Sequence, residues 1–149
     1  MRINRWIGVL LFLGTLLLSA CGKSQAVIPV TGKNAPVKVE HLGGADPTRI
    51  TLTEPAAKRL DIQTVLVQEA EVSGTQRLVA PYAAILYDTQ GNTWVYTNPE
   101  PLVFVRQPVV VDHIEGDLAV LSNGPDAGSM VVTVGAEELF GSETEFEEE

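Results

Sequence analysis

The chain has 149 residues and carries 19 acidic against 10 basic side chains, a formal net charge of −9. A surface of this sign repels phosphate groups, so we expect no binding to nucleic acid. The single cysteine excludes an internal disulfide framework, so a domain formed by this chain has to be held together by its packed core.

The first 20 residues have the pattern of an export signal. Arg2 and Arg5 give a positive start, an apolar run follows over 7–18, and two small residues precede Cys21. The run is shorter than the roughly 20 apolar residues that a membrane-spanning helix needs. We therefore expect residues 1–20 to be a signal peptide that is removed.

The segment Leu18-Ser19-Ala20-Cys21 resembles the lipobox of bacterial lipoproteins. The resemblance implies that Cys21 is diacylated on its sulfur, becomes the first residue of the mature chain and holds it on an extracytoplasmic membrane face. Two acyl chains give stable attachment, because each buried methylene contributes about 0.8 kcal/mol. The mature chain would keep 8 basic and 19 acidic side chains, which favours solubility beyond the anchor. The expected location is periplasmic or on the outer face of the cell membrane.

Residues 21–47 are predicted to be the lipidated cysteine and a flexible tether. The segment is rich in glycine, proline and small residues and has no sustained helical period. About 25 flexible residues span roughly 25 to 30 Å on average, so the folded domain could stand off the bilayer.

Order is expected to begin at Thr48. Alternating residues predict a strand over 48–52, and capping chemistry predicts a short helix over 53–60, in which Thr53 caps the first turn. The β-branched segment 62–67 predicts a half-buried strand.

From residue 77 onward, short strands alternate with turn residues, which is typical of a mainly β domain. The expected strands are 77–79, 84–87, 93–97, 102–111, 118–121 and 130–134. Pro108 predicts an edge position or a bulge within the longest of them, because proline cannot donate to a ladder. The pattern favours a small β-barrel or a two-layer β domain over 48–141 with one or two short helices. The acidic residues 142–149 predict a solubilising, disordered tail.

Five segments share their order with parts of a known family. Residues 50–64 (ITLTEPAAKRLDIQT) resemble the first folded segment of periplasmic adaptor subunits, the membrane fusion proteins of tripartite efflux pumps. The segments that resemble the membrane-proximal β domain of that family are 81–88, 91–96, 104–111 and 128–136. Full adaptors carry a long helical hairpin and a lipoyl-like domain between these parts, and here only 68–80 fills that space.

The resemblance implies a lipid-anchored accessory protein of a membrane transport or efflux system, with no catalytic role and no cofactor. Its β domain would dock on an inner-membrane transporter, and self-association is expected because adaptors commonly work as multimers. The alternative is a stand-alone binding lipoprotein for a small ligand or cation. The accessory protein predicts a β core without a pocket, whereas the binding lipoprotein predicts a cavity lined by Trp94 and Tyr96.

Trp94, Tyr96, Phe104 and Arg106 are the candidate partner-binding residues. Trp94 and Tyr96 share one face of a strand by the period of two, so they form either an exposed platform or part of a core. Packing in a core is the commoner outcome for such residues.

The candidate metal ligands are Asp112, His113, Glu115 and Asp117. An oxygen-rich turn can take a hard cation, but the simpler interpretation is a surface turn. No catalytic residue is identified, because the serines of the expected domain lie in predicted turns without a nucleophile motif.

Overall fold

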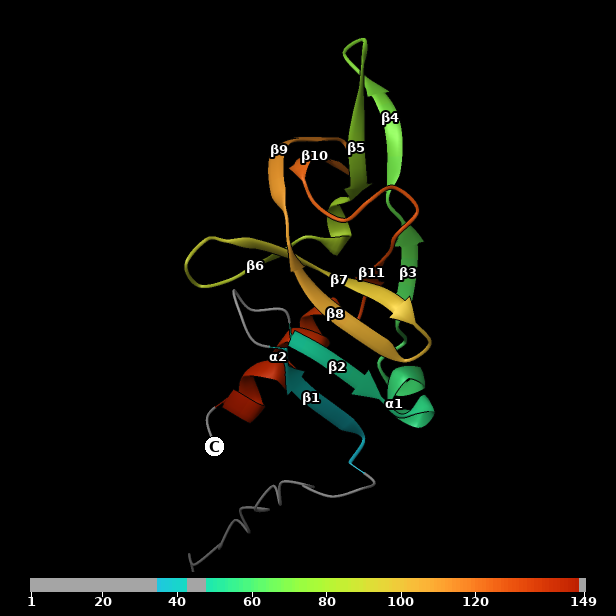
Figure 1. Ribbon diagram of the computed structural model, residues 1–149, viewed down its shortest axis with the longest axis vertical. Coiled ribbons are helices and arrows are strands. Elements are labelled where there is room, and N and C mark those ends of the chain that lie inside the picture. Colours follow the sequence, from blue (N-terminus) through green and yellow to red (C-terminus); the bar gives the residue numbers. More distant parts are fainter. Residues whose placement is uncertain (1–34, 43–47, 148–149) are drawn as a thin grey trace, which may run out of the picture.

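The computed structural model describes residues 35–42 and 48–147, which form eleven strands in two antiparallel sheets, two α-helices and one short 3-10 helix (Figure 1). The described part is mainly β, as the sequence predicts. The signal peptide, Cys21, residues 22–34 and 43–47 of the predicted tether, and residues 148–149 of the predicted tail lie outside the described residues. No helix within 35–42 and 48–147 is long and apolar enough to cross a membrane.

The larger sheet contains seven strands, and the smaller sheet contains four. The order in the larger sheet is β1 (Val37–His41), β2 (Thr48–Leu52), β8 (Val103–Pro108), β7 (Thr93–Glu100), β11 (Met130–Val134) and β3 (Gln63–Leu66), with β6 (Leu86–Tyr87) paired to β7. The order in the smaller sheet is β4 (Gln68–Val72), β5 (Thr75–Pro81), β10 (Leu118–Asn123) and β9 (Val110–Glu115).

The chain passes from the larger sheet to the smaller sheet twice, each time through one valine. Val67 separates β3 from β4, and Val109 separates β8 from β9. Both valines are buried, at 1% and 4% exposure, and belong to the same core. The interruption predicted at Pro108 therefore falls where the expected long strand divides between the two sheets.

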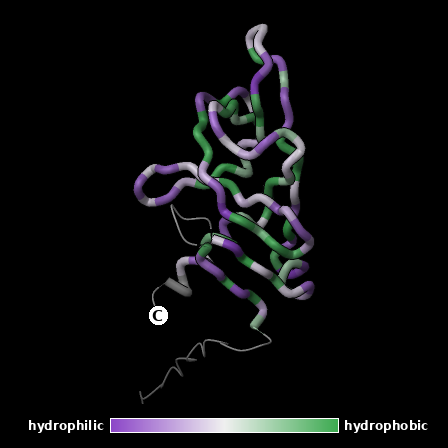
Figure 2. Tube along the Cα trace, in the orientation of Figure 1, coloured by the Kyte–Doolittle hydropathy of each residue, from purple (hydrophilic) through white to green (hydrophobic). Residues whose placement is uncertain are grey.

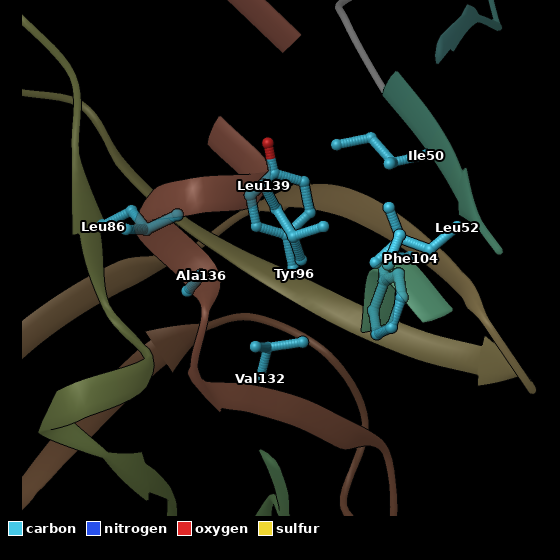
Figure 3. Packing of buried hydrophobic residues seen from close by; sticks show 9 residues of the cluster. Ile50, Leu52, Leu86, Tyr96, Phe104, Val132, Ala136 and Leu139 are labelled. Atoms are coloured by element: carbon cyan, nitrogen blue, oxygen red, sulfur yellow. The ribbon is translucent and has the colours of Figure 1, made fainter. Parts of the chain in front are cut away.

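Two hydrophobic cores hold the elements together. The first lies between the larger sheet and the helices and includes Tyr96 and Leu139, which lie close together in Figure 3. The second includes residues of both sheets, among them Val95, Val131 and Ala119. Because neither sheet covers its own apolar face, the two sheets and the helices depend on one another for burial.

The first helix, α1 (Glu54–Arg59), lies within the predicted 53–60. The carbonyl of Thr53 accepts the N–H of Ala57 at 3.0 Å, but the Thr53 side chain makes no capping hydrogen bond. The predicted capping role of the hydroxyl is therefore wrong. The 3-10 helix η1 (Tyr82–Ala84) leads from β5 toward β6.

The strand β1 corrects the predicted tether, which was expected to run to residue 47. Val39 lies opposite Ile50 of β2, and Val37 lies opposite Leu52. Both valines pack against the first core, and Lys38 between them is exposed. The alternation of these residues is that of a half-buried strand, but it becomes recognisable only beside its partner β2.

The helix α2 (Ala136–Glu147) corrects the predicted disordered tail over 142–149. Leu139 and Glu143 are one turn apart, so they share a face of this helix. That face lies against the larger sheet, where the exposures of Leu139 and Glu143 are 0% and 1%. The acidic composition suggested disorder, but one of its carboxylates has a buried partner.

Candidate functional site

A buried ionic and aromatic cluster fastens α2 to the larger sheet. Tyr96 of β7 lies directly opposite Arg106 of β8, and Glu143 of α2 lies between their polar ends. The Tyr96 hydroxyl donates a 2.5 Å hydrogen bond to Glu143 Oε2, and Arg106 Nη2 lies 3.1 Å from Glu143 Oε1. Burial of these three side chains makes the pairing necessary, because an unpaired ion in a core is costly.

Two aromatic rings enclose the cation of this cluster. The Arg106 guanidinium carbon lies 4.5 Å from the centre of the Trp94 ring and 5.8 Å from the centre of the Phe140 ring. Both distances are within the range of a cation–π interaction. Arg106 therefore connects a strand residue and a helix residue through its planar head group. We call Trp94, Tyr96, Arg106, Phe140 and Glu143 the Glu143 cluster.

The carboxylate of Asp88 connects Trp94 to the loop between β6 and β7. Its oxygens accept hydrogen bonds from the side-chain amide of Asn92 at 2.7 Å and from the indole N–H of Trp94 at 3.1 Å. The backbone N–H groups of Asn92 and Gln90 donate to it at 2.8 and 2.9 Å. These donors, the Asn92 side chain foremost, lower the pKa of Asp88 to about 2. The hydrophilic loop between β6 and β7, which projects to the left in Figure 2, is thereby tied to Trp94.

An open groove of about 610 Å³ lies beside this loop. Tyr87 and Asn92 line it from the β6–β7 hairpin, Trp94 forms part of its wall, and Pro108 and Val110 line it from the strands that connect the sheets. Tyr87 and Val110 are each 52% exposed, so the groove has an accessible apolar surface. Its size and opening suit contact with a partner side chain or a small molecule.

The four candidate partner-binding residues do not share one exposed surface. Tyr96, Phe104 and Arg106 are buried, so these three pack in the core instead of forming a platform. Trp94 is half-buried and reaches the groove. Of these four residues, Trp94 is therefore the one that a partner could reach, through the groove.

Three of the four candidate metal ligands, Asp112, His113 and Glu115, form a paired surface on β9, whereas Asp117 lies in the turn before β10. Asp112 accepts a 2.9 Å hydrogen bond from Arg77 Nη2, and this donor, followed by the neighbouring His113, lowers the pKa of Asp112. His113 Nδ1 lies 3.2 Å from Asp112, and its Nε2 lies 3.9 Å from Glu115. In the part of the chain that the structure describes, no three His, Cys, Asp or Glu side chains are grouped so that they could hold a metal ion.

Sequence reasoning missed three residues of this region, which are Asp88, Phe140 and Glu143. Ala136, Leu139 and Glu143 have the spacing of one helix face, and this was the available signal for α2. For Asp88, the signal was its place at the start of a turn, where aspartate commonly accepts local backbone N–H groups. The partner of Glu143 had no local signal, because Tyr96 lies 47 residues away.

No protein-family model, curated protein or solved structure matches this chain. Its function therefore has to be inferred from its own residues. Their arrangement gives a mainly β domain whose last helix is fastened by a buried carboxylate, with accessible surface at the groove and at the sheet edges.

Proposed function

We propose that this chain is a lipid-anchored extracytoplasmic accessory protein of a membrane transport system, resembling a truncated periplasmic adaptor subunit. The observation that carries the proposal is the lipobox-like segment ending at Cys21, placed ahead of a mainly β domain. Attachment through Cys21 keeps the domain at a membrane, and docking on an integral membrane partner is the role that the adaptor resemblance supplies.

The distance between anchor and domain supports action close to the membrane. About 15 residues separate Cys21 from Val37, where β1 begins. A segment of that length reaches at most about 50 Å when fully extended. The domain is thus confined to a partner at or near the same bilayer.

The resemblance of residues 50–64 and of the four later segments supports a transport partner. The segment 68–80, which stands in place of the adaptor's helical hairpin, forms β4 and most of β5. In this proposal the chain contributes the membrane-proximal contact of an adaptor and leaves the bridging of the envelope to another component.

The proposal is tested by amine-reactive crosslinking of the full chain in native membranes, followed by mass spectrometry. Lys38 of β1 and Lys58 of α1 are exposed, so both can react with the crosslinker. The Cys21→Ala variant is the control, since it should leave the membrane fraction and lose membrane crosslinks. A transporter subunit crosslinked to the wild type alone supports the proposal. Membrane attachment without a transporter partner would overturn it.

The groove beside Trp94 is the observation that favours the alternative, a stand-alone binding lipoprotein. Tyr96, expected to line its cavity, lies instead in the core and donates to Glu143. The binding lipoprotein would therefore have to use Tyr87 and Trp94 alone as aromatic contacts. Broadening of the Trp94 indole signal by a small-molecule library, together with no transporter crosslink, would favour this alternative.

A further inference from the structure

The strands β3 and β4 form one continuous edge of the molecule. They follow each other along the right side of Figure 1, with only Val67 between them. β3 is the last strand in the larger sheet, and β4 is the last strand in the smaller sheet. Beyond β11 and β5, respectively, no further described strand pairs with them, so their outer backbone groups face away from the sheets.

β3 differs in charge from the other edge strands of four or more residues within 35–42 and 48–147. The edge strand β6 is also uncharged, but it has two residues, and so short an edge gives little template for an added strand. β1 carries Lys38 and Glu40, β4 carries Glu69 and Glu71, and β9 carries charges of its own. β3 has the sequence QTVL and carries none. Charged residues on an edge strand discourage pairing with another chain. β3 is therefore the described edge with the least protection against addition of a strand.

Apolar side chains are exposed along β3. Val65 and Leu66 are 42% and 44% exposed, although they are neighbours on a strand and so point to opposite faces. Val134, which precedes α2 at the end of β11, is 40% exposed and lies opposite Gln63. An added strand would cover apolar surface on both faces of the sheet, which is the arrangement that strand-addition sites use.

The ends of this edge are acidic. Asp61 precedes β3, and Glu69 and Glu71 lie in β4, and all three residues are exposed. In the described part of the chain, neither Glu69 nor Glu71 has an ion-pair partner. A strand that pairs along this edge would therefore gain from basic side chains at its ends.

We propose that the β3–β4 edge binds an extended segment of a partner protein that is apolar in its middle and basic at its ends, by adding it as a strand next to β3. The inference deepens the proposed function, on which it rests for the membrane location of that partner. It names the docking surface and the chemistry that the surface selects.

A second copy of this chain fits the edge less well. Antiparallel pairing of two β3 strands about Val65 would place Asp61 of one copy opposite Glu69 of the other. Like charges directly opposite each other on paired strands are destabilising. The acidic net charge of the chain adds to this repulsion.

The test uses the full chain in a zwitterionic detergent and two synthetic peptides of about ten residues, the reach of β3 and β4 together. One peptide has valines in its middle and lysines at both ends, and the other has glutamates in place of the lysines. We expect the basic peptide to bind and to slow amide hydrogen exchange at 63–66, and we expect the acidic peptide not to bind. Protection at strands other than β3 and β4, or equal binding of both peptides, would overturn the proposal.

Two lysine variants separate edge pairing from bulk charge attraction. Leu66→Lys changes β3, and Val110→Lys makes the same change of charge at an exposed apolar residue of β9. We expect Leu66→Lys to weaken binding by about tenfold or more and Val110→Lys to change it little. Equal weakening would show that only net charge attracts the peptide and would overturn the proposal.

A third variant keeps the test independent of any folding defect in β3. The double variant Glu69→Gln with Glu71→Gln removes two exposed charges without altering the edge backbone. We expect it to weaken the binding of the basic peptide. Glu137→Gln with Glu138→Gln, at exposed positions of α2, is the matched control. Unchanged binding in the β4 double variant would overturn the charge argument.

Failure of this inference and failure of the proposed function give different results. If a transporter is crosslinked equally to the wild type and to Leu66→Lys, the proposed function is supported and the proposal that the partner binds at the β3–β4 edge is overturned. Peptide binding at 63–66 with no transporter crosslink in membranes would support the edge and overturn the proposed function. The wild type could instead form a dimer in sedimentation analysis that is dissociated by Leu66→Lys and by no other variant. That result would assign the edge to a second copy of the chain and would overturn the proposal of a basic partner.

Discussion

The hydroxyl of Tyr96 donates a 2.5 Å hydrogen bond to the carboxylate of Glu143, and so joins the middle of the largest sheet to the last helix. The same carboxylate lies 3.1 Å from Arg106. Because the three side chains are buried together, Glu143 fastens the last turns of α2 to the sheet, beside the core contact of Leu139.

Glu143→Ala is expected to destabilise the domain by about 3 kcal/mol, because it leaves the Arg106 guanidinium buried without its carboxylate. Urea unfolding followed by tryptophan fluorescence measures the loss. Glu137→Ala, at an exposed position of the same helix, is the control and should stay within about 0.5 kcal/mol of the wild type. A loss below about 1 kcal/mol for Glu143→Ala would mean that the helix end is not fastened by this pair.

Replacing both ions by apolar residues should be less harmful than removing one. The double variant Arg106→Met with Glu143→Leu is expected to be at least about 1 kcal/mol more stable than either single variant, since no unpaired charge remains in the core. Unfolding free energies of the wild type, both single variants and the double variant form the cycle that measures this coupling. Strictly additive losses would show that the two side chains act independently.

The local pattern of the sequence predicts much of the sheet region. Residues 130–134 match β11 from end to end, and the predicted helix over 53–60 contains α1. Both elements carry their signal within a few residues, as alternation in one case and terminal residue chemistry in the other. The hairpin of β4 and β5 was missed over its first half, although Ser73 and Gly74 form a two-residue turn between the strands.

The parts that the sequence did not predict depend on distant partners. β1 is ordered by pairing with β2, and α2 extends past 141 because Glu143 meets Tyr96 and Arg106. Acidic composition alone favours disorder, and nothing near Glu143 in the sequence indicates a buried cation. The candidate site was predicted in Trp94, Tyr96 and Arg106, but not in Phe140 or in the Glu143 carboxylate that organises them.

Asp88 should make stability depend on pH in the acid range. The pKa of Asp88 is about 2 in the folded chain, below the value of about 3.9 for an unfolded chain. The unfolded state therefore binds the proton more readily, so the stabilisation is present above about pH 4 and is lost as the pH falls toward 2. Unfolding measured over this range should show a steeper fall for the wild type than for Asp88→Asn.

The nuclear magnetic resonance signal of the Trp94 indole N–H provides a direct readout of that ionisation, because this group donates to Asp88 at 3.1 Å. We expect its chemical shift to titrate with a midpoint near 2. Asp126→Asn removes an exposed carboxylate from another turn and should leave the titration unchanged. The assignment would fail if the signal titrated near pH 4 or did not titrate in the folded protein.

Gly135 is expected to be the least replaceable glycine among the described residues, because it lies at the joint between β11 and α2 with a φ of +84°. An added Cβ would lie 2.3 Å from Ile62 Cδ1 and 3.2 Å from the carbonyl oxygen of Leu60. Gly128→Ala is the matched control, since Gly128 has a φ of +90° and no atom within 4 Å of an added Cβ. The control should lose about 1–2 kcal/mol from backbone strain alone.

Gly135→Ala should lose about 1–3 kcal/mol more than this control, because overpacking adds to the same strain. Urea midpoints at constant m-value give both losses. Equal losses would mean that Ile62 moves aside without cost, so that the joint between β11 and α2 is less tightly packed than the distances indicate.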